Sequence, residues 1–184
     1  MCLASPRAVD DSVSPRQADD SVSVSESLRA RLETQLEALD VVVAGVTRDL
    51  LDARPAPGEW SARENLAHLA RHSTVFLERL DRILREDAPR LGRYRAEDDP
   101  EWRQWASLSV EEALHRLKDA RHRLITWVSG LSRDDVRRVA VHPSFGVMTI
   151  PQWLEFFLLH EAHHLYTVML RVAEAKHAAS AATR

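Results

Sequence analysis

The fold is decided by residues 150–174, which read IPQWLEFFLLHEAHHLYTVMLRVAE. One set of apolar residues in this stretch recurs at steps of three, four or eight: Ile150, Leu154, Phe157, Leu165, Val168 and Val172. Such spacing places these side chains on one face of an α-helix. Thr149 precedes the stretch and Gln152 follows three residues later, which is the pattern of an N-terminal capping box. The stretch therefore predicts a long amphipathic helix that buries this face against other helices.

Three further segments have the same helical spacing. The first covers residues 28–50, where apolar residues follow at steps of four and three. The second begins near Ser61 and the third near Ser109, each with a Glu three residues on that completes a capping box. Residues 137–148 are expected to form a bend or a small hairpin. Four amphipathic helices without a series of strands predict an all-α fold, an antiparallel four-helix bundle.

The two ends and one long connection lie outside this pattern. Residues 1–24 are rich in Ser, Asp and Val and are expected to form a disordered, flexible tail, with the bundle at 25–176 and a frayed C-terminus at 177–184. Residues 87–108, between the second and third helices, contain Pro, Gly and acidic residues together with Trp102 and Trp105. Long connections often cover a site, so these two tryptophans are candidates for the mouth of a pocket.

Composition excludes several classes of function. A net charge of -3 and no basic run predict no nucleic-acid partner. The single cysteine, Cys2, cannot form an internal disulfide, which favours the cytoplasm. No stretch approaches the roughly 18 consecutive apolar residues of a membrane span, so we expect no membrane insertion.

Histidines in two of the helices indicate a metal site. His160 and His164 are one helical turn apart, so their rings lie about 40° apart around the helix axis and can reach one ion. The second helix carries another such pair, of which His68 is the predicted third ligand and His72 a reserve. Three imidazoles and an open position suit zinc, nickel or iron. The alternative is that these histidines are partly buried polar groups of the core.

The same stretch, residues 160–164, also fits H-E-x-x-H, the zinc-peptidase pattern in which the Glu is a general base. A peptidase needs a third ligand after His164, and residues 165–184 offer only Glu174 and His177, close to the end. Proteolysis is therefore weakly supported. Glu161 is a weak catalytic candidate as the base of another metal-dependent hydrolase, and we favour a role in orienting a ligand histidine.

Three motifs, taken in order, resemble the DinB-like (DinB/YfiT-type) four-helix bundles of bacteria. They are EWSARENLAHL at residues 59–69, His142-Pro143 with Phe145-Gly146 before the last helix, and HEAHH at residues 160–164. The resemblance covers roughly residues 28–174. It implies a divalent metal held by one histidine of the second helix and two of the last, which correspond here to His68, His160 and His164.

The resemblance also implies homodimers and small-molecule substrates. Relatives transfer or isomerise substrates with low-molecular-weight thiols such as bacillithiol or mycothiol, which makes a thiol S-transferase or isomerase the leading hypothesis, with the metal lowering the pKa of a thiol cosubstrate. The alternative is a metal-binding or stress-related interaction protein without catalysis. The apolar run 153–159 is either a subunit interface or a segment buried beneath the 87–108 connection.

Overall fold

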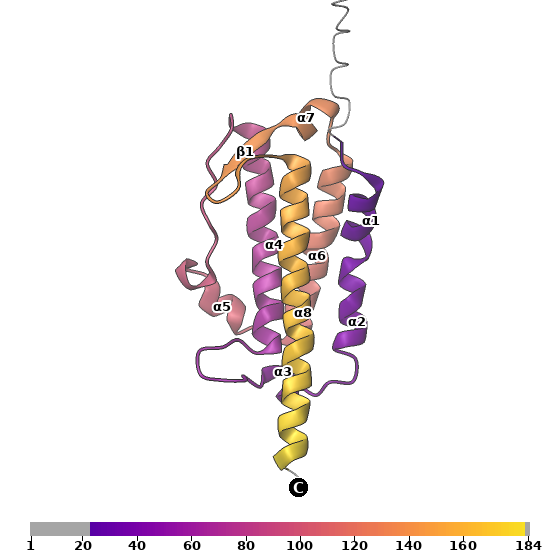
Figure 1. Ribbon diagram of the computed structural model, residues 1–184, viewed down its shortest axis with the longest axis vertical. Helices are drawn as coiled ribbons and strands as arrows, with labels where there is room; N and C mark the ends of the chain where they lie inside the picture. Colours follow the sequence, from indigo (N-terminus) through magenta and orange to yellow (C-terminus); the bar gives the residue numbers. More distant parts are fainter. Residues whose placement is uncertain (1–22, 183–184) are drawn as a thin grey trace, which may run out of the picture.

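The computed structural model describes residues 23–182, and four helical columns form its core (Figure 1). Three columns are single helices, α4 (Ala62–Arg85), α6 (Val110–Ser129) and α8 (Ile150–Ala182). The fourth is built from α1 (Glu26–Thr34), the 3-10 turn η1 (Gln35–Glu37) and α2 (Ala38–Val42). The predicted all-α four-helix bundle is confirmed. Of the predicted tail, residues 1–22 lie outside the described residues, whereas Val24 is buried in the core.

The directions of the helices differ from a simple antiparallel order. α8 runs antiparallel to α4, but α6 runs parallel to it (Figure 1). Arg63, at the start of α4, donates to the carbonyl of Leu108 just before α6, and Trp127, near the end of α6, donates to Asp81 near the end of α4. The parallel pair is possible because the 87–108 connection returns along the bundle to the end from which α4 starts.

The predicted first helix, residues 28–50, is shorter and interrupted. The column ends at Val42, after which α3 (Arg48–Asp52) forms a separate turn. Consecutive β-branched residues at 41–43 have reduced helix propensity, and Gly45 adopts a φ of 67°, which suits a residue just past a helix end. These two features stop the helix before Leu50.

The last helix is longer than predicted. α8 continues to Ala182 rather than ending near Glu174, so residues 177–182 are helical rather than frayed. Residues 175–182 include five alanines, the residue with the highest intrinsic helix propensity. Its beginning is capped as predicted, since Gln152 Oε1 accepts a hydrogen bond of 2.8 Å from the backbone N–H of Thr149.

A small hairpin closes one end of the bundle, as expected for residues 137–148. It follows α7 (Arg133–Arg137) and pairs β1 (Val139–His142) antiparallel with β2 (Gly146–Thr149). Gly146 has a φ of 71°, which a residue without Cβ adopts readily at the turn. The hairpin holds His142 against α8, where its ring centroid lies 5.1 Å from that of Phe156.

The 87–108 connection is anchored at several points along α4. It contains the short elements η2 (Ala96–Asp98) and α5 (Trp102–Ala106). Arg71 of α4 donates to Asp99 at 2.7 Å, and the hydroxyl of Tyr94 donates to the same carboxylate at 3.0 Å. These contacts lay Tyr94 and Trp102 along the side of α4. Within residues 23–182, no helix is both long and apolar enough to span a membrane.

Candidate metal centre

Three histidines from two helices meet between α4 and α8. His68 of α4 and His160 and His164 of α8 each offer one ring nitrogen, and these nitrogens all lie within 4.8 Å of one another. The antiparallel packing of α4 on α8 produces this arrangement, because it sets position 68 opposite 160 and position 65 opposite 164. The structure therefore brings together all three residues that the sequence predicted as ligands.

The spacing of the nitrogens fits a shared ion. His68 Nε2 and His160 Nε2 are 3.3 Å apart. Ligands bound at about 2.0–2.1 Å around a tetrahedral ion lie about 3.3–3.4 Å from one another, so both rings can bind one ion at this separation. The donor set also fits, since neutral imidazole nitrogens suit zinc and other late divalent transition metals.

Asn65 determines which nitrogen of His164 is free. The amide nitrogen of Asn65 donates to the carbonyl oxygen of Ser61 at 2.8 Å, so its Oδ1 faces His164 Nδ1 at 2.9 Å. An amide oxygen only accepts, and Nδ1 must therefore carry the proton of the neutral ring. The lone pair is left on Nε2 for a metal, the arrangement usual for metal-binding histidines.

The start of α4 supports this hydrogen-bond chain. The Ser61 hydroxyl accepts from the backbone N–H of Glu64 at 3.1 Å, and Glu64 in turn accepts from the backbone N–H of Ser61 at 2.9 Å. This is the capping box predicted from the sequence. Asn65 was not predicted, although a polar residue three positions before His68 on a buried face was a usable signal.

The three rings are held in the neutral form that binds metals. Burial, together with repulsion from the neighbouring histidines, lowers the pKa of His68, His160 and His164 to about 3 in each case. A buried imidazolium would lose its hydration and face the other rings, so protonation is disfavoured. No proton then competes for the ligand nitrogens at neutral pH.

Aromatic rings enclose His68. The ring centroids of Trp60, Tyr94 and Trp102 lie 5.0, 5.8 and 6.0 Å from that of His68. Trp102 thus lies beside the cluster, whereas Trp105 is buried and packs against the guanidinium of Arg116. Trp60 and Tyr94 were not predicted to lie at the site.

The two other histidines of these motifs, His72 and His163, lie outside the group of three. His72 is buried, and its ring centroid lies 3.9 Å from that of His160, but it does not belong to the group of three. It is therefore a neighbour of the cluster. His163 is exposed on the outer side of α8, as its helical position indicates.

Glu161 points away from the cluster. Its Oε1 accepts from Gln35 Nε2 at 2.8 Å, and its Oε2 is paired with Arg121 of α6. Gln35 lies on the column of α1 and α2 and Arg121 on α6, so neither partner belongs to the helix that carries His68, and Glu161 is 0% exposed. The residue that hydrogen-bonds a histidine of the cluster is therefore Asn65 and not Glu161, for which we expected that contact. Arg121 was missed, although a charged residue on the apolar face of α6 was visible in the sequence.

Comparisons with known proteins agree with this fold. The family model of the DinB superfamily matches residues 31–168. The chain is 30% identical over 149 residues to "Uncharacterized protein YuaE" of Bacillus subtilis, covering 74% of this chain and 88% of that protein. It is 29% identical over 132 residues to "Putative metal-dependent hydrolase OB0782" of Oceanobacillus iheyensis, covering 67% and 71%.

Two solved structures share the fold. One is YfiT from Bacillus subtilis, described as "a probable metal-dependent hydrolase with an unusual four-helix bundle topology", with a TM-score of 0.66, 20% identity, and coverage of 91% of this chain and 93% of that one. The other is TT2238, "a four-helix bundle protein", with a TM-score of 0.58, 25% identity, and coverage of 79% and 98%.

Proposed function

Because the chain belongs to the DinB superfamily, we propose that it is a divalent-metal-dependent enzyme that acts on a small molecule. The observation that carries the proposal is the meeting of His68, His160 and His164 with their ring nitrogens within 4.8 Å. No carboxylate of the described residues belongs to this group. Three neutral ligands beside a cavity leave room for a substrate to approach, as catalytic sites require.

Each residue of the site has a defined part in this proposal. The three histidines hold the ion through ring nitrogens, and Asn65 keeps His164 in the correct tautomer. Trp60 and Trp102, whose ring centroids are 4.9 Å apart, pack beside His68 and shield that side from water. A divalent ion held there supplies a Lewis acid, which lowers the pKa of a nucleophile that reaches the site. Zinc, nickel and iron all suit three imidazoles.

The reaction we propose first is S-transfer from a low-molecular-weight thiol. The sulfur of the thiolate attacks an electrophilic carbon of the substrate, a carbon–sulfur bond forms, the leaving group departs with its electron pair, and the thiol proton passes to solvent. Isomerisation through a reversible thiol adduct uses the same first step. Cys2 has no part in either reaction, because the nucleophilic thiol belongs to a cosubstrate.

Hydrolysis is the second candidate, since two similar proteins are described as a "Putative metal-dependent hydrolase" and "a probable metal-dependent hydrolase". Water then replaces the thiol as the nucleophile. The geometry opposes a mechanism in which Glu161 of the H-E-x-x-H motif acts as general base, because Gln35 and Arg121 hold its carboxylate. A third alternative, a metal-binding protein without catalysis, predicts no turnover with any pair of thiol and electrophile.

The first test is the metal content of the purified protein by elemental mass spectrometry. We expect about one ion per chain in the wild type, loss in His68→Ala and His164→Ala, and retention in the matched control His163→Ala, whose ring is exposed beside the cluster. Absence of metal in the wild type, even after addition of zinc, nickel or iron, would overturn the proposal.

A second assay separates the reaction classes. Bacillithiol or mycothiol is mixed with 1-chloro-2,4-dinitrobenzene, and the thioether product is followed by its absorbance. Metal-dependent product formation that His164→Ala abolishes supports S-transfer. Metal-dependent cleavage of an ester without any thiol supports hydrolysis instead. If metal-loaded protein shows neither activity, the result supports a metal-binding protein without catalysis.

A further inference from the structure

A cavity of about 430 Å³ opens beside the histidine cluster. His160 and His164 line one side of it, and the rest comes from α4, the 87–108 connection, the hairpin and Phe156. Ten residues line the cavity, and none is an Asp or a Glu. The charged side chains that line it are two arginines, Arg79 and Arg93.

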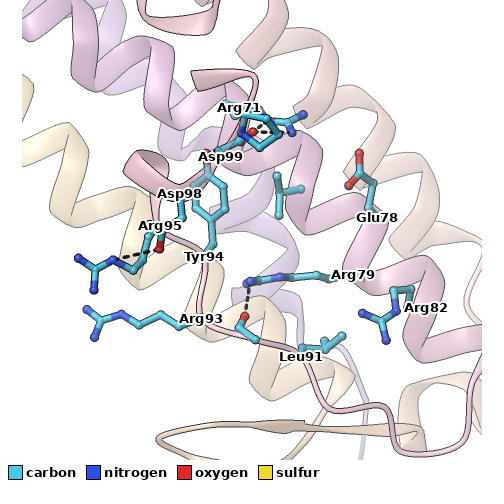
Figure 2. A pocket seen from close by; sticks show the side chains of 13 residues that line it. Arg71, Glu78, Arg79, Arg82, Leu91, Arg93, Tyr94, Arg95, Asp98 and Asp99 are labelled. Carbon is cyan, nitrogen blue, oxygen red and sulfur yellow. Dashed lines mark hydrogen bonds and ion pairs between the residues drawn. The ribbon is translucent and has the colours of Figure 1, made fainter. Parts of the chain in front are cut away.

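Arg79 is a half-buried cation without an acidic partner in the part of the chain that the structure describes. Burial lowers the pKa of its guanidinium, and its Nη2 donates to the carbonyl oxygen of Gly92 at 2.6 Å (Figure 2). By contrast, Arg71, two turns earlier on α4, is paired with Asp99 at 2.7 Å. A guanidinium carries five N–H donors, so Arg79 keeps donors for a further acceptor. A partly desolvated cation without a counter-charge gains when an anion binds to it.

His142 adds a second kind of donor to the cavity. Its Nδ1 accepts from the backbone N–H groups of Ser144 and Phe145 at 3.1 and 3.2 Å. The proton of the neutral ring is therefore on Nε2, which can donate to a ligand. Arg93, exposed on the connection, lines the same cavity.

An apolar wall completes the cavity. The rings of Phe145 and Phe156 lie 5.7 Å apart, edge to face, and both line it. A ligand that fits has an apolar body for this wall and an anionic group for the arginines. Arginine binds carboxylates through paired N–H donors, which gives direction as well as attraction.

We propose that this cavity binds the carboxylate of a small organic anion, with Arg79 as the principal contact, Arg93 at the rim and His142 Nε2 as an additional donor. The inference rests on the proposed function, because the bound carboxylate would place its substrate beside the histidine cluster. It names the substrate class of that site, a carboxylic acid with an apolar or aromatic body.

The test compares two probes that differ only in charge, phenylacetate and phenylacetamide, by isothermal titration calorimetry on the full-length protein as purified. We expect phenylacetate to bind at least about tenfold more tightly, since hydrogen bonds to charged groups are stronger than neutral ones. Arg79→Gln is expected to remove that preference, and Arg93→Gln to reduce it. The matched controls are Arg82→Gln on α4 and Arg95→Gln on the connection, which line a neighbouring cavity and not this one.

The outcomes separate the two proposals. Equal affinity for both probes in a wild type that holds metal overturns the carboxylate inference and leaves the metal site standing. If the protein holds no metal but still prefers phenylacetate, and Arg79→Gln removes that preference, the carboxylate inference is supported. The proposal of a metal-dependent enzyme then fails. The carboxylate inference is also overturned if Arg79→Gln is folded, as judged by circular dichroism, and still prefers phenylacetate. If Arg79→Gln does not fold, Arg93→Gln, at an exposed position, is compared with the wild type instead. A reduced preference for phenylacetate supports the inference, and an unchanged preference overturns it.

Discussion

Asn65 acts on the metal site through a single hydrogen bond. Because its Oδ1 holds the Nδ1 proton of His164, Asn65→Ala is expected to lower zinc affinity by about 10–100-fold, the usual effect of removing a group that orients a ligand. The measurement is a competition titration against a chromophoric chelator. Asn65→Asp, which keeps an acceptor oxygen, is expected to retain affinity. Unchanged affinity in Asn65→Ala would show that the bond does not orient His164.

The buried histidines also make the metal-free protein sensitive to acid. Folding lowers the pKa of His68, His160 and His164 from 6.5 to about 3, so between these values the unfolded chain binds more protons than the folded one. The free energy of unfolding is therefore expected to fall as the pH drops from 6.5 to 5, by up to about 1.4 kcal/mol per pH unit for each histidine.

Urea denaturation of the metal-free protein at pH 7.5, 6.5 and 5.5 measures this dependence. The window lies above the ordinary pKa of carboxylic acids, so the histidines dominate it. His68→Gln, which removes one of the three groups, is expected to give a shallower slope. A free energy of unfolding that is constant over this window would mean that the rings titrate normally in the folded state.

At the scale of helices, the Arg121–Glu161 pair joins α6 to α8 inside the bundle. Arg121→Met leaves the Glu161 carboxylate buried with only Gln35, and loss of one member of such a pair costs about 3–5 kcal/mol. The double variant Arg121→Met/Glu161→Leu removes both charges and is expected to lose less than the sum of the two single changes. A double-mutant cycle by urea denaturation measures the difference.

A further variant, Glu161→Gln, tests whether Glu161 has any catalytic part. Since its carboxylate is held on the side away from His68, folded Glu161→Gln is expected to keep the metal content of the wild type. It should also keep turnover in any assay that the wild type passes. Loss of turnover with metal retained and the fold intact would restore Glu161 as a catalytic base.

The sequence predicts the elements better than their arrangement. Apolar spacing and capping residues locate α4, α6 and α8, because both signals are local and depend on residues within one or two turns. The direction of α6 depends instead on the path of residues 87–108, and hydrophobic periodicity does not predict the path of a connection. The three predicted ligand histidines lie in short motifs, and the structure brings them together, whereas Asn65 and Arg79 gain their importance from contacts with residues distant in the sequence.

At the scale of the whole molecule, one face of α8 is apolar and exposed. Leu159, Tyr166 and Leu170 are 68%, 60% and 38% exposed, and their spacing of seven and four puts them on one side of the helix. The neighbouring Trp153 and Phe157 are buried in the core, so the apolar run 153–159 is partly explained by the bundle itself. The 87–108 connection runs along α4 and leaves Leu159 uncovered.

We propose that a second copy of the chain covers this face, as the resemblance to DinB-like proteins implied. Two copies of α8 packed through the same stripe form a symmetric interface, in which Leu159 and Tyr166 of one protomer meet the stripe of its partner. Size-exclusion chromatography with light scattering is expected to give twice the mass of the chain. Leu159→Glu/Tyr166→Glu is expected to give the monomer mass, because it sets carboxylates against an apolar surface.

Val41→Glu is the matched control, since Val41 is 81% exposed and lies on a different helix, α2. It should leave the mass unchanged. A wild type that is monomeric at about 100 µM, well above the micromolar dissociation constants of modest interfaces, would exclude the dimer. A dimer that survives Leu159→Glu/Tyr166→Glu would place the interface elsewhere. The proposed interface would also lie close to the histidine cluster, because exposed His163 lies between Leu159 and Tyr166 in the sequence of α8 and is next to His164.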